Sequence, residues 1–351
     1  MSSDAAPVLT PVEGRAAHLT LNRPRALNSL THTMLRSVAS ALDTWEHDPA
    51  VETVVLDGAG ERGLCAGADI RLFHDDARSG DHHASRAFLR DEYRLNSRIA
   101  HYPKPYVAVM DGIVMGGGVG LSAHGGIRVV TERSKVAMPE VGIGLVPDVG
   151  GTYLFSRAPG RLGTHLALTG ATIGAADAVL CGLADHYVPS RALPQLLREL
   201  AESDPREAVA RHAEQPPRES GTLVEQRDWI DACYAAATVE EIVERLLATG
   251  EIAAKETADT ILSRSPMAVK ATLESLRRAA RLDTLEQALD QEYRVICAAL
   301  HTHDLPEGIR AQIIDKDRDP HWSPATLPEV TAADVERYFA PLGEGHELGL
   351  G

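Results

Sequence analysis

Two acids and a run of glycines stand in the most apolar part of the chain, between Asp111 and Gly151. Glu140 and Asp148 lie eight residues apart, and three consecutive glycines occupy positions 116–118. A carboxylate in apolar surroundings is costly to ionise, and its raised pKa suits it to acid–base chemistry. A glycine run lets a backbone N–H approach a ligand with no side chain in between. The combination predicts a site that activates a carbonyl group.

A second glycine turn precedes this segment, with the sequence Cys-Ala-Gly-Ala-Asp at residues 65–69. Two such turns can offer two backbone N–H groups to one oxygen, which is the requirement for an oxyanion hole. The glycine run matches neither common phosphate-binding pattern. Leu121 stands where the dinucleotide fingerprint needs its third glycine, and no Gly-Lys-Ser/Thr follows as in a P-loop.

Short apolar strands and helical patterns alternate around these residues. Strands are expected over 18–22, 51–58, 106–112 and 127–132, and a helix capped by Ser29 or Thr31 over 29–46. This alternation favours an α/β fold built from β–β–α or β–α units. Because the glycine run follows a strand and precedes a helical pattern, Gly117 is expected at a helix N-terminus, where free N–H groups favour negative charge.

The character of the chain changes near residue 195. Residues 10–195 are expected to form the α/β core, and residues 196–351 a helical C-terminal region that completes the site and packs on the core. Ser265 and Pro266 are expected to begin a helix as its cap and first residue, and another helix is expected over 282–300.

Composition excludes several classes of protein. The 351 residues carry a net charge of −15, which argues against a nucleic-acid partner. No apolar run approaches the roughly 18 residues of a membrane span, and residues 1–14 lack the features of a secretory signal. The four cysteines show no paired spacing, as expected of reduced thiols. These features together predict a cytoplasmic protein.

Other polar residues offer weaker chemistry. Ser122 and His124 suggest a serine hydrolase, but the G-x-S-x-G pattern is absent. The histidines, densest at 301–303, lack the spacing of a metal site, so no metal is predicted. Arg23, Arg25 and Arg71 flank the early glycine turns, where each is either a phosphate contact or a solvated surface charge.

Four segments together resemble the crotonase, or enoyl-CoA hydratase/isomerase, superfamily. They are RPRALNSL (23–30), CAGADI (65–70), KPYVAVMDGIVMGGGVGLSAHG (104–125) and AMPEVGIGLVPDVGGTYLFSR (137–157). The chain is most similar to the 3-hydroxyisobutyryl-CoA hydrolase branch, on the evidence of FLRDEYRLN (88–96), PEVGIGLVPDVGG (139–151) and HDLPEGIRAQIIDKDRDPHWSPATLPEV (303–330). The resemblance extends from about residue 10 to residue 335.

The resemblance implies a crotonase-like spiral of β–β–α units with a C-terminal helical region and an acyl-CoA thioester as the substrate. It implies an oxyanion hole made by the N–H groups of Ala68 and Gly117. Coenzyme A enters as part of the substrate, and no separate cofactor is expected. The resemblance also implies coenzyme A contacts at Arg25, Leu27 and Ala66, and a homotrimer.

The chain departs from the hydratases of the superfamily at position 120. Hydratases carry there a glutamate that pairs with the one at the position of Glu140, whereas this chain has Gly120. It has Asp148 where hydratases usually have glycine, which is the arrangement of the hydrolases. By the same resemblance, Glu92 is a substrate-contacting acid that reaches a 3-hydroxyl group.

These features predict hydrolysis of a short branched 3-hydroxyacyl-CoA, 3-hydroxyisobutyryl-CoA of valine breakdown being the best candidate. Glu140 would attack the thioester carbonyl or activate a water, and Asp148 would orient that group and assist proton transfer to the departing thiolate. Two alternatives are an enoyl-CoA hydratase or isomerase that uses Glu140 alone, and a non-catalytic acyl-CoA-binding protein.

Overall fold

The computed structural model describes residues 6–351, which form two compact units. Unit 1 consists of residues up to 69 together with 94–137 and 172–222, and unit 2 consists of 70–93, 138–171 and 223–351. The units interleave along the chain, whereas the sequence predicts a single boundary near residue 195. As predicted, the C-terminal part of the chain is mainly helical.

Within residues 6–351, every strand belongs to unit 1. The strands are β1 Val8–Leu9, β2 Val12–Glu13, β3 Ala16–Leu21, β4 Thr53–Gly58, β5 Tyr106–Met110, β6 Ile113–Met115, β7 Ile127–Val130, β8 Lys135–Ala137 and β9 His186–Tyr187. The helices of unit 1 are α1 His32–Glu46, α4 Gly117–Ser122, α7 Ala175–Leu180, α8 Leu193–Leu200 and α9 Pro205–His212.

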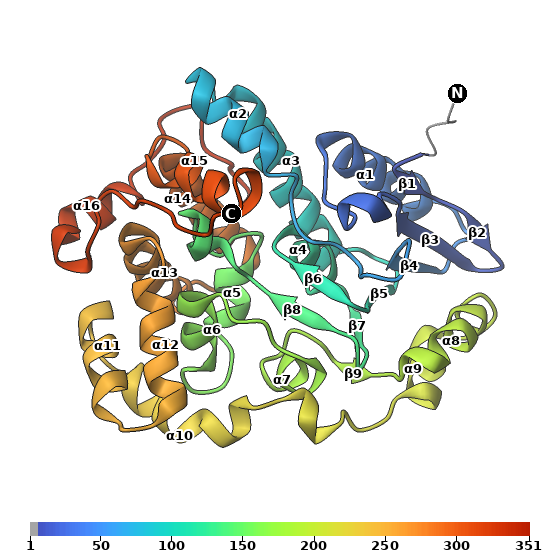
Figure 1. Ribbon diagram of the computed structural model, residues 1–351. Helices are drawn as coiled ribbons and strands as arrows, with labels where there is room; N and C mark the ends of the chain where they lie inside the picture. The colour runs from blue at the N-terminus through green and yellow to red at the C-terminus, as the bar shows by residue number, and fades with distance from the viewer. Residues whose placement is uncertain (1–5) are drawn as a thin grey trace. The chain divides into compact units, whose positions relative to one another are not determined.

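The main sheet of unit 1 has the strand order β1-β3-β4-β5-β7-β9, with β2 also paired to β3 (Figure 1). The pairs from β3 to β9 are parallel, and β6 and β8 form a separate parallel pair. The strand pair β5–β6 is therefore repeated by β7–β8. Together with α4 this arrangement agrees with the predicted β–β–α repeat.

Alternate side chains of the sheet bury one face against two helices. Ala16, Val55, Val107 and Val129 pack with apolar residues of α8 and α9 in one buried cluster. Because successive side chains of a strand point to opposite faces, the residues between them face the other side of the sheet. This two-sided burial explains the almost continuous apolar sequence of β4 and β5.

The main helices of unit 2 are α2 Arg71–Ser79, α5 Gly151–Phe155, α6 Leu162–Thr169, α10 Leu223–Cys233, α11 Val239–Ala248, α12 Ile252–Leu262, α13 Pro266–Ala279, α14 Leu285–Ala299, α15 Asp304–Ile309 and α16 Ala332–Arg337. Helix α3, His83–Ala100, begins in unit 2 and ends in unit 1. No helix within residues 6–351 is long and apolar enough to cross a bilayer.

The caps of α13 and α1 show where these two helices begin. Ser265 accepts the Ala268 N–H at 3.1 Å and Pro266 is the first residue of α13, as predicted. Helix α1 begins at His32, and its cap is Thr31, which accepts the Met34 N–H at 3.3 Å. The alternative cap, Ser29, lies outside the helix, because Leu30 pairs with the Ala68 turn instead.

Candidate active site

The glycine run of unit 1 forms a sharp turn between β6 and α4. Gly116 has φ 49° and ψ −120°, which only glycine adopts readily, and α4 begins at Gly117 as predicted. Gly118 lies against the other glycine turn, because a Cβ on it would be 2.6 Å from the Cys65 carbonyl oxygen. The amides of the first turn of a helix have no partner within the helix. The Gly117 N–H is therefore directed out of α4.

The second turn, around Ala68, lies beside the first. Leu30 donates its N–H to Gly67 O at 2.8 Å and accepts the Asp69 N–H at 2.8 Å, so the Ala68 N–H points away from Leu30. A Cβ on Gly67 would be 3.7 Å from the Gly117 nitrogen. Unit 1 thus brings together the two turns whose amides were predicted to bind one oxygen.

Two of the residues predicted to contact coenzyme A, Leu27 and Ala66, lie at this second turn. The Ala66 N–H donates to Leu27 O at 3.0 Å, and Leu27 has the left-handed φ of 52°. Arg25 is exposed and is the middle residue of a short 3₁₀ helix, Pro24–Ala26, just before Leu27. Arg23, by contrast, is engaged within the protein, donating to Ser29 O at 2.6 Å.

The predicted acids belong to unit 2. Glu140 begins the 3₁₀ helix η2, Glu140–Ile143, and is 8% exposed. Its Oε2 atom is buried and has no hydrogen-bond partner among the described residues. Burial, followed by the charge of Asp148, raises the pKa of Glu140 well above its ordinary value. Glu140 therefore keeps its proton to higher pH than an exposed glutamate does.

Asp148 precedes α5 and is 9% exposed. Burial raises the pKa of Asp148 to about 6, and a hydrogen bond from Tyr93 limits the rise. The Tyr93 hydroxyl donates to Asp148 Oδ2 at 2.6 Å, which favours the ionised carboxylate. Asp148 consequently ionises below neutral pH while it remains buried.

Glu92 is the third acid of this cluster. It lies on α3 next to Tyr93, is 1% exposed, and has an Oε1 atom without a hydrogen-bond partner among the described residues. Burial and then the charge of Asp148 raise the pKa of Glu92 well above the usual glutamate range. Unit 2 thus places three buried acids within electrostatic reach of one another, with unequal tendencies to ionise.

Two residues of the cluster were missed by the sequence analysis. Tyr93 contacts Asp148, and Glu292 of α14 accepts the N–H groups of Gly150 and Thr152 at 2.7 and 2.9 Å. Both contacts join segments far apart in the chain. The one available signal for Glu292 was a carboxylate on the apolar stripe of α14, where Leu285, Ala288 and Leu289 are also buried.

The serine hydrolase alternative disagrees with the structure. The Ser122 hydroxyl is buried and donates to Gly118 O, one turn earlier in α4, at 2.6 Å. A hydroxyl bound to its own helix is not presented to a substrate. Within residues 6–351, no three His, Cys, Asp or Glu side chains gather in an arrangement that could hold a metal ion. The four cysteines are buried, and within residues 6–351 none of them forms a disulfide.

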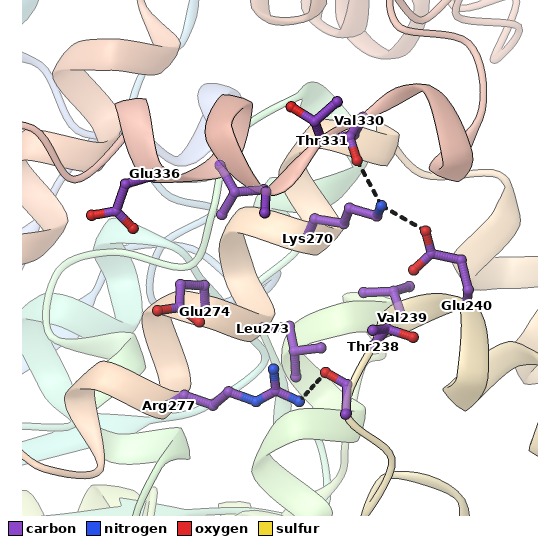
Figure 2. A pocket seen from close by; sticks show the side chains of 13 residues that line it. Thr238, Val239, Glu240, Lys270, Leu273, Glu274, Arg277, Val330, Thr331 and Glu336 are labelled. Atoms are coloured by element: carbon purple, nitrogen blue, oxygen red, sulfur yellow. Dashed lines mark hydrogen bonds and ion pairs between the residues drawn. The ribbon is translucent and has the colours of Figure 1, made fainter.

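A separate cavity of about 370 Å³ opens in unit 2 beside α11, α13 and α16 (Figure 2). Lys270 donates to Val330 O at 2.8 Å and pairs with Glu240 at 2.6 Å, and Arg277 donates to Ala237 O at 2.6 Å. The predicted acids do not line this cavity. Because its cations are bound to protein oxygens, we do not place the thioester there.

The comparisons with known proteins agree on the family. Residues 16–339 match the family model described as enoyl-CoA hydratase/isomerase. The chain therefore belongs to the enoyl-CoA hydratase/isomerase family, and its fold is the crotonase fold. A mouse relative named 3-hydroxyisobutyryl-CoA hydrolase, mitochondrial, is 43% identical over 98% of this chain and 91% of its own length.

Two solved structures are similar over almost the whole chain. A carnitinyl-CoA dehydratase from Mycobacterium thermoresistibile is 55% identical, with a TM-score of 0.94 and 99% of each chain covered. An enoyl-CoA hydratase from Rhodobacter sphaeroides is 44% identical, with a TM-score of 0.92, covering 98% of this chain and 99% of its own. The mouse relative is thus named for thioester hydrolysis, whereas the two solved structures are named for the addition or removal of water.

Proposed function

We propose that the protein hydrolyses a short branched 3-hydroxyacyl-CoA thioester, 3-hydroxyisobutyryl-CoA being the preferred candidate, to the free hydroxy acid and coenzyme A. The observation that carries the proposal is the distribution of acids. Helix α4 has Gly120 where a hydratase of this family has its second glutamate, whereas Glu140, Asp148 and Glu92 gather in unit 2. The hydrolase names of relatives that are 43% identical support the same proposal.

In the proposed reaction, the N–H groups of Ala68 and Gly117 stabilise the negative charge on the thioester oxygen. Glu140 either attacks the carbonyl carbon itself or removes a proton from a water that attacks it. If Glu140 attacks, the C–S bond of the tetrahedral intermediate breaks to leave a mixed anhydride on Glu140, and Asp148 gives a proton to the departing thiolate. A water then cleaves the anhydride, which releases the hydroxy acid, restores the Glu140 carboxylate and returns a proton to Asp148. If a water attacks instead, the proton that Glu140 takes from it passes with the help of Asp148 to the thiolate as the C–S bond breaks.

Glu92 is proposed to select the acyl group. Its Oε1 atom is buried without a hydrogen-bond partner among residues 6–351, and such an atom is costly unless a ligand binds it. A substrate 3-hydroxyl would satisfy it. The test is thiol release over a panel that includes 3-hydroxyisobutyryl-CoA and isobutyryl-CoA, which lacks the hydroxyl. We expect kcat/KM for the hydroxylated substrate to be higher by at least tenfold, and equal values would contradict the proposed role.

A second candidate is an enoyl-CoA hydratase or dehydratase, favoured by the names of the two solved structures. Such an enzyme adds or removes water at a carbon–carbon double bond and leaves the C–S bond intact. Release of free thiol therefore separates the two functions. Tight acyl-CoA binding without turnover of any thioester would instead support a non-catalytic binding protein.

Three further properties belong to the proposal. Coenzyme A enters as part of the substrate and no separate cofactor is required, so dialysis against a chelator should leave the rate unchanged. A homotrimer is the expected assembly, which analytical ultracentrifugation tests. The cytoplasm remains the predicted location, although the mouse relative is named mitochondrial, and fractionation of the source cells distinguishes the two.

A further inference from the structure

Glu292 is a buried carboxylate whose two oxygens are both occupied by one short segment. Oε2 accepts the Gly150 N–H at 2.7 Å, and Oε1 accepts the Thr152 N–H at 2.9 Å and the Thr152 hydroxyl. Glu92 and Glu140 each keep one oxygen without a partner among the described residues. Both oxygens of Glu292 thus accept hydrogen bonds from the protein, whereas Glu92 and Glu140, the acids proposed to contact the substrate, each have one oxygen left to accept a hydrogen bond from it.

The segment that Glu292 holds is strained and follows Asp148 directly. Val149 and Gly150 have left-handed φ values of 52° and 82°. A β-branched residue rarely adopts this conformation, which persists only where the surroundings enforce it. The Gly151 N–H then turns back to Asp148 O at 2.6 Å. The main-chain position of Asp148 thus depends on the turn at 149–151.

The Glu292 carboxylate replaces the missing cap of α5. Gly150, the residue before the helix, has no side chain to accept the first amides. Glu292 accepts them from α14 instead, so that a long helix fixes the start of a helix of five residues.

We propose that Glu292 is a positioning residue that holds the turn after Asp148 and so keeps the Asp148 carboxylate in place for reaction; this inference rests on the proposed thioester hydrolysis. Glu292 is not expected to touch the substrate. Its role is to keep the left-handed turn closed, so that Asp148 stays within hydrogen-bonding distance of the Tyr93 hydroxyl.

The variant Glu292→Gln tests the proposal with almost no change in size. A glutamine has one acceptor oxygen, so its NH₂ group must face either the Gly150 or the Thr152 N–H, donor against donor. A displacement of about 1 Å at a reacting group can cost on the order of 10² in rate. Burial raises the pKa of Glu292 to about 8, so the comparison is made above pH 8, where the wild-type carboxylate is ionised and accepts at both oxygens. We expect kcat for thiol release to fall there by about 10–10², with KM changed less than threefold.

A second readout follows the turn itself. Hydrogen exchange at the Gly150 amide or at the Thr152 amide should be at least tenfold faster in Glu292→Gln than in the wild type, because one of the two amides loses its acceptor. If this variant fails to fold, Glu292→Asp retains both acceptors on a shorter side chain and should show a smaller effect in the same direction. Unchanged exchange at both amides would overturn the proposal.

The matched control is Asp177→Asn in unit 1. Asp177 is another buried carboxylate, 4% exposed, and accepts the Thr222 N–H at 2.9 Å. We expect this control to lower the melting temperature while kcat stays within twofold of wild type. Equal loss of kcat in both variants at matched stability would show that Glu292 acts through general stability alone. A wild-type enzyme that releases no thiol would instead contradict the proposed function, while hydrogen exchange would still test the turn.

Discussion

The two units supply different kinds of functional group. In unit 1 the candidate groups are backbone N–H groups at Ala68 and Gly117, placed by glycine turns that pack closely on each other. In unit 2 they are the side chains of Glu140 and Glu92, which lie on helices, and of Asp148, which lies in the loop before α5; burial raises the pKa of all three. Unit 1 is therefore expected to be sensitive to added volume, and unit 2 to changes of charge and hydrogen bonding.

The largest expected effect is in unit 2. Glu140→Gln keeps the shape of the side chain but removes the carboxylate that would attack or activate water, so kcat for thiol release should fall by about 10²–10⁴. Glu13→Gln, at an exposed glutamate of β2, is the matched control and should retain the wild-type rate. A near-wild-type rate in Glu140→Gln would remove Glu140 from the mechanism.

The corresponding test of unit 1 adds a single methyl group. In Gly118→Ala the new Cβ would lie 2.6 Å from the Cys65 carbonyl oxygen and force the two turns apart. Displacing one oxyanion donor costs on the order of 10²–10³ in rate, and we expect a loss of kcat of that size. Gly126→Ala is the control, because its Cβ would meet nothing within 4 Å. Equal rates in both alanine variants would contradict an oxyanion hole at this turn.

A smaller effect is expected at Tyr93. Its hydroxyl lowers the pKa of Asp148 by favouring the charged form, so Tyr93→Phe should raise that pKa by about 1–2 units. If ionised Asp148 is needed, the rising limb of the pH–rate profile moves to higher pH, and the rate at pH 7 falls by about two- to tenfold. Tyr106→Phe is the control, because within residues 6–351 the buried Tyr106 hydroxyl has no partner to lose. An unchanged pH–rate profile in Tyr93→Phe would show that the Tyr93 hydroxyl does not affect catalysis through Asp148.

The last prediction concerns stability rather than rate. Burial raises the pKa of Glu292 to about 8, so between about pH 5 and pH 8 the folded protein binds more protons at this site than the unfolded chain. The contribution of Glu292 to the free energy of unfolding must then fall as pH rises through that window. The stability advantage of wild type over Glu292→Gln should shrink from pH 5 to pH 8 in urea titrations. An advantage that grows with pH would contradict the raised pKa.

Local features of the site could be predicted from the sequence, whereas its long-range contacts could not. The helix start at Gly117 could be predicted because glycines and strand–helix patterns are local signals. The acids Glu140 and Asp148 stood out by their apolar neighbours. Tyr93 and Glu292 could not be found in the same way, because their partners lie 55 and about 140 residues away in the chain and only the folded structure brings them together.

The most direct test of the central claim compares two reactions of the wild-type enzyme. Thiol release from 3-hydroxyisobutyryl-CoA and loss of the conjugated absorbance of crotonyl-CoA are measured on the same preparation. With Gly120 on α4 and the acids in unit 2, we predict that kcat/KM for thiol release exceeds that for hydration by at least 10². Hydration of crotonyl-CoA at an equal or greater kcat/KM would contradict the account.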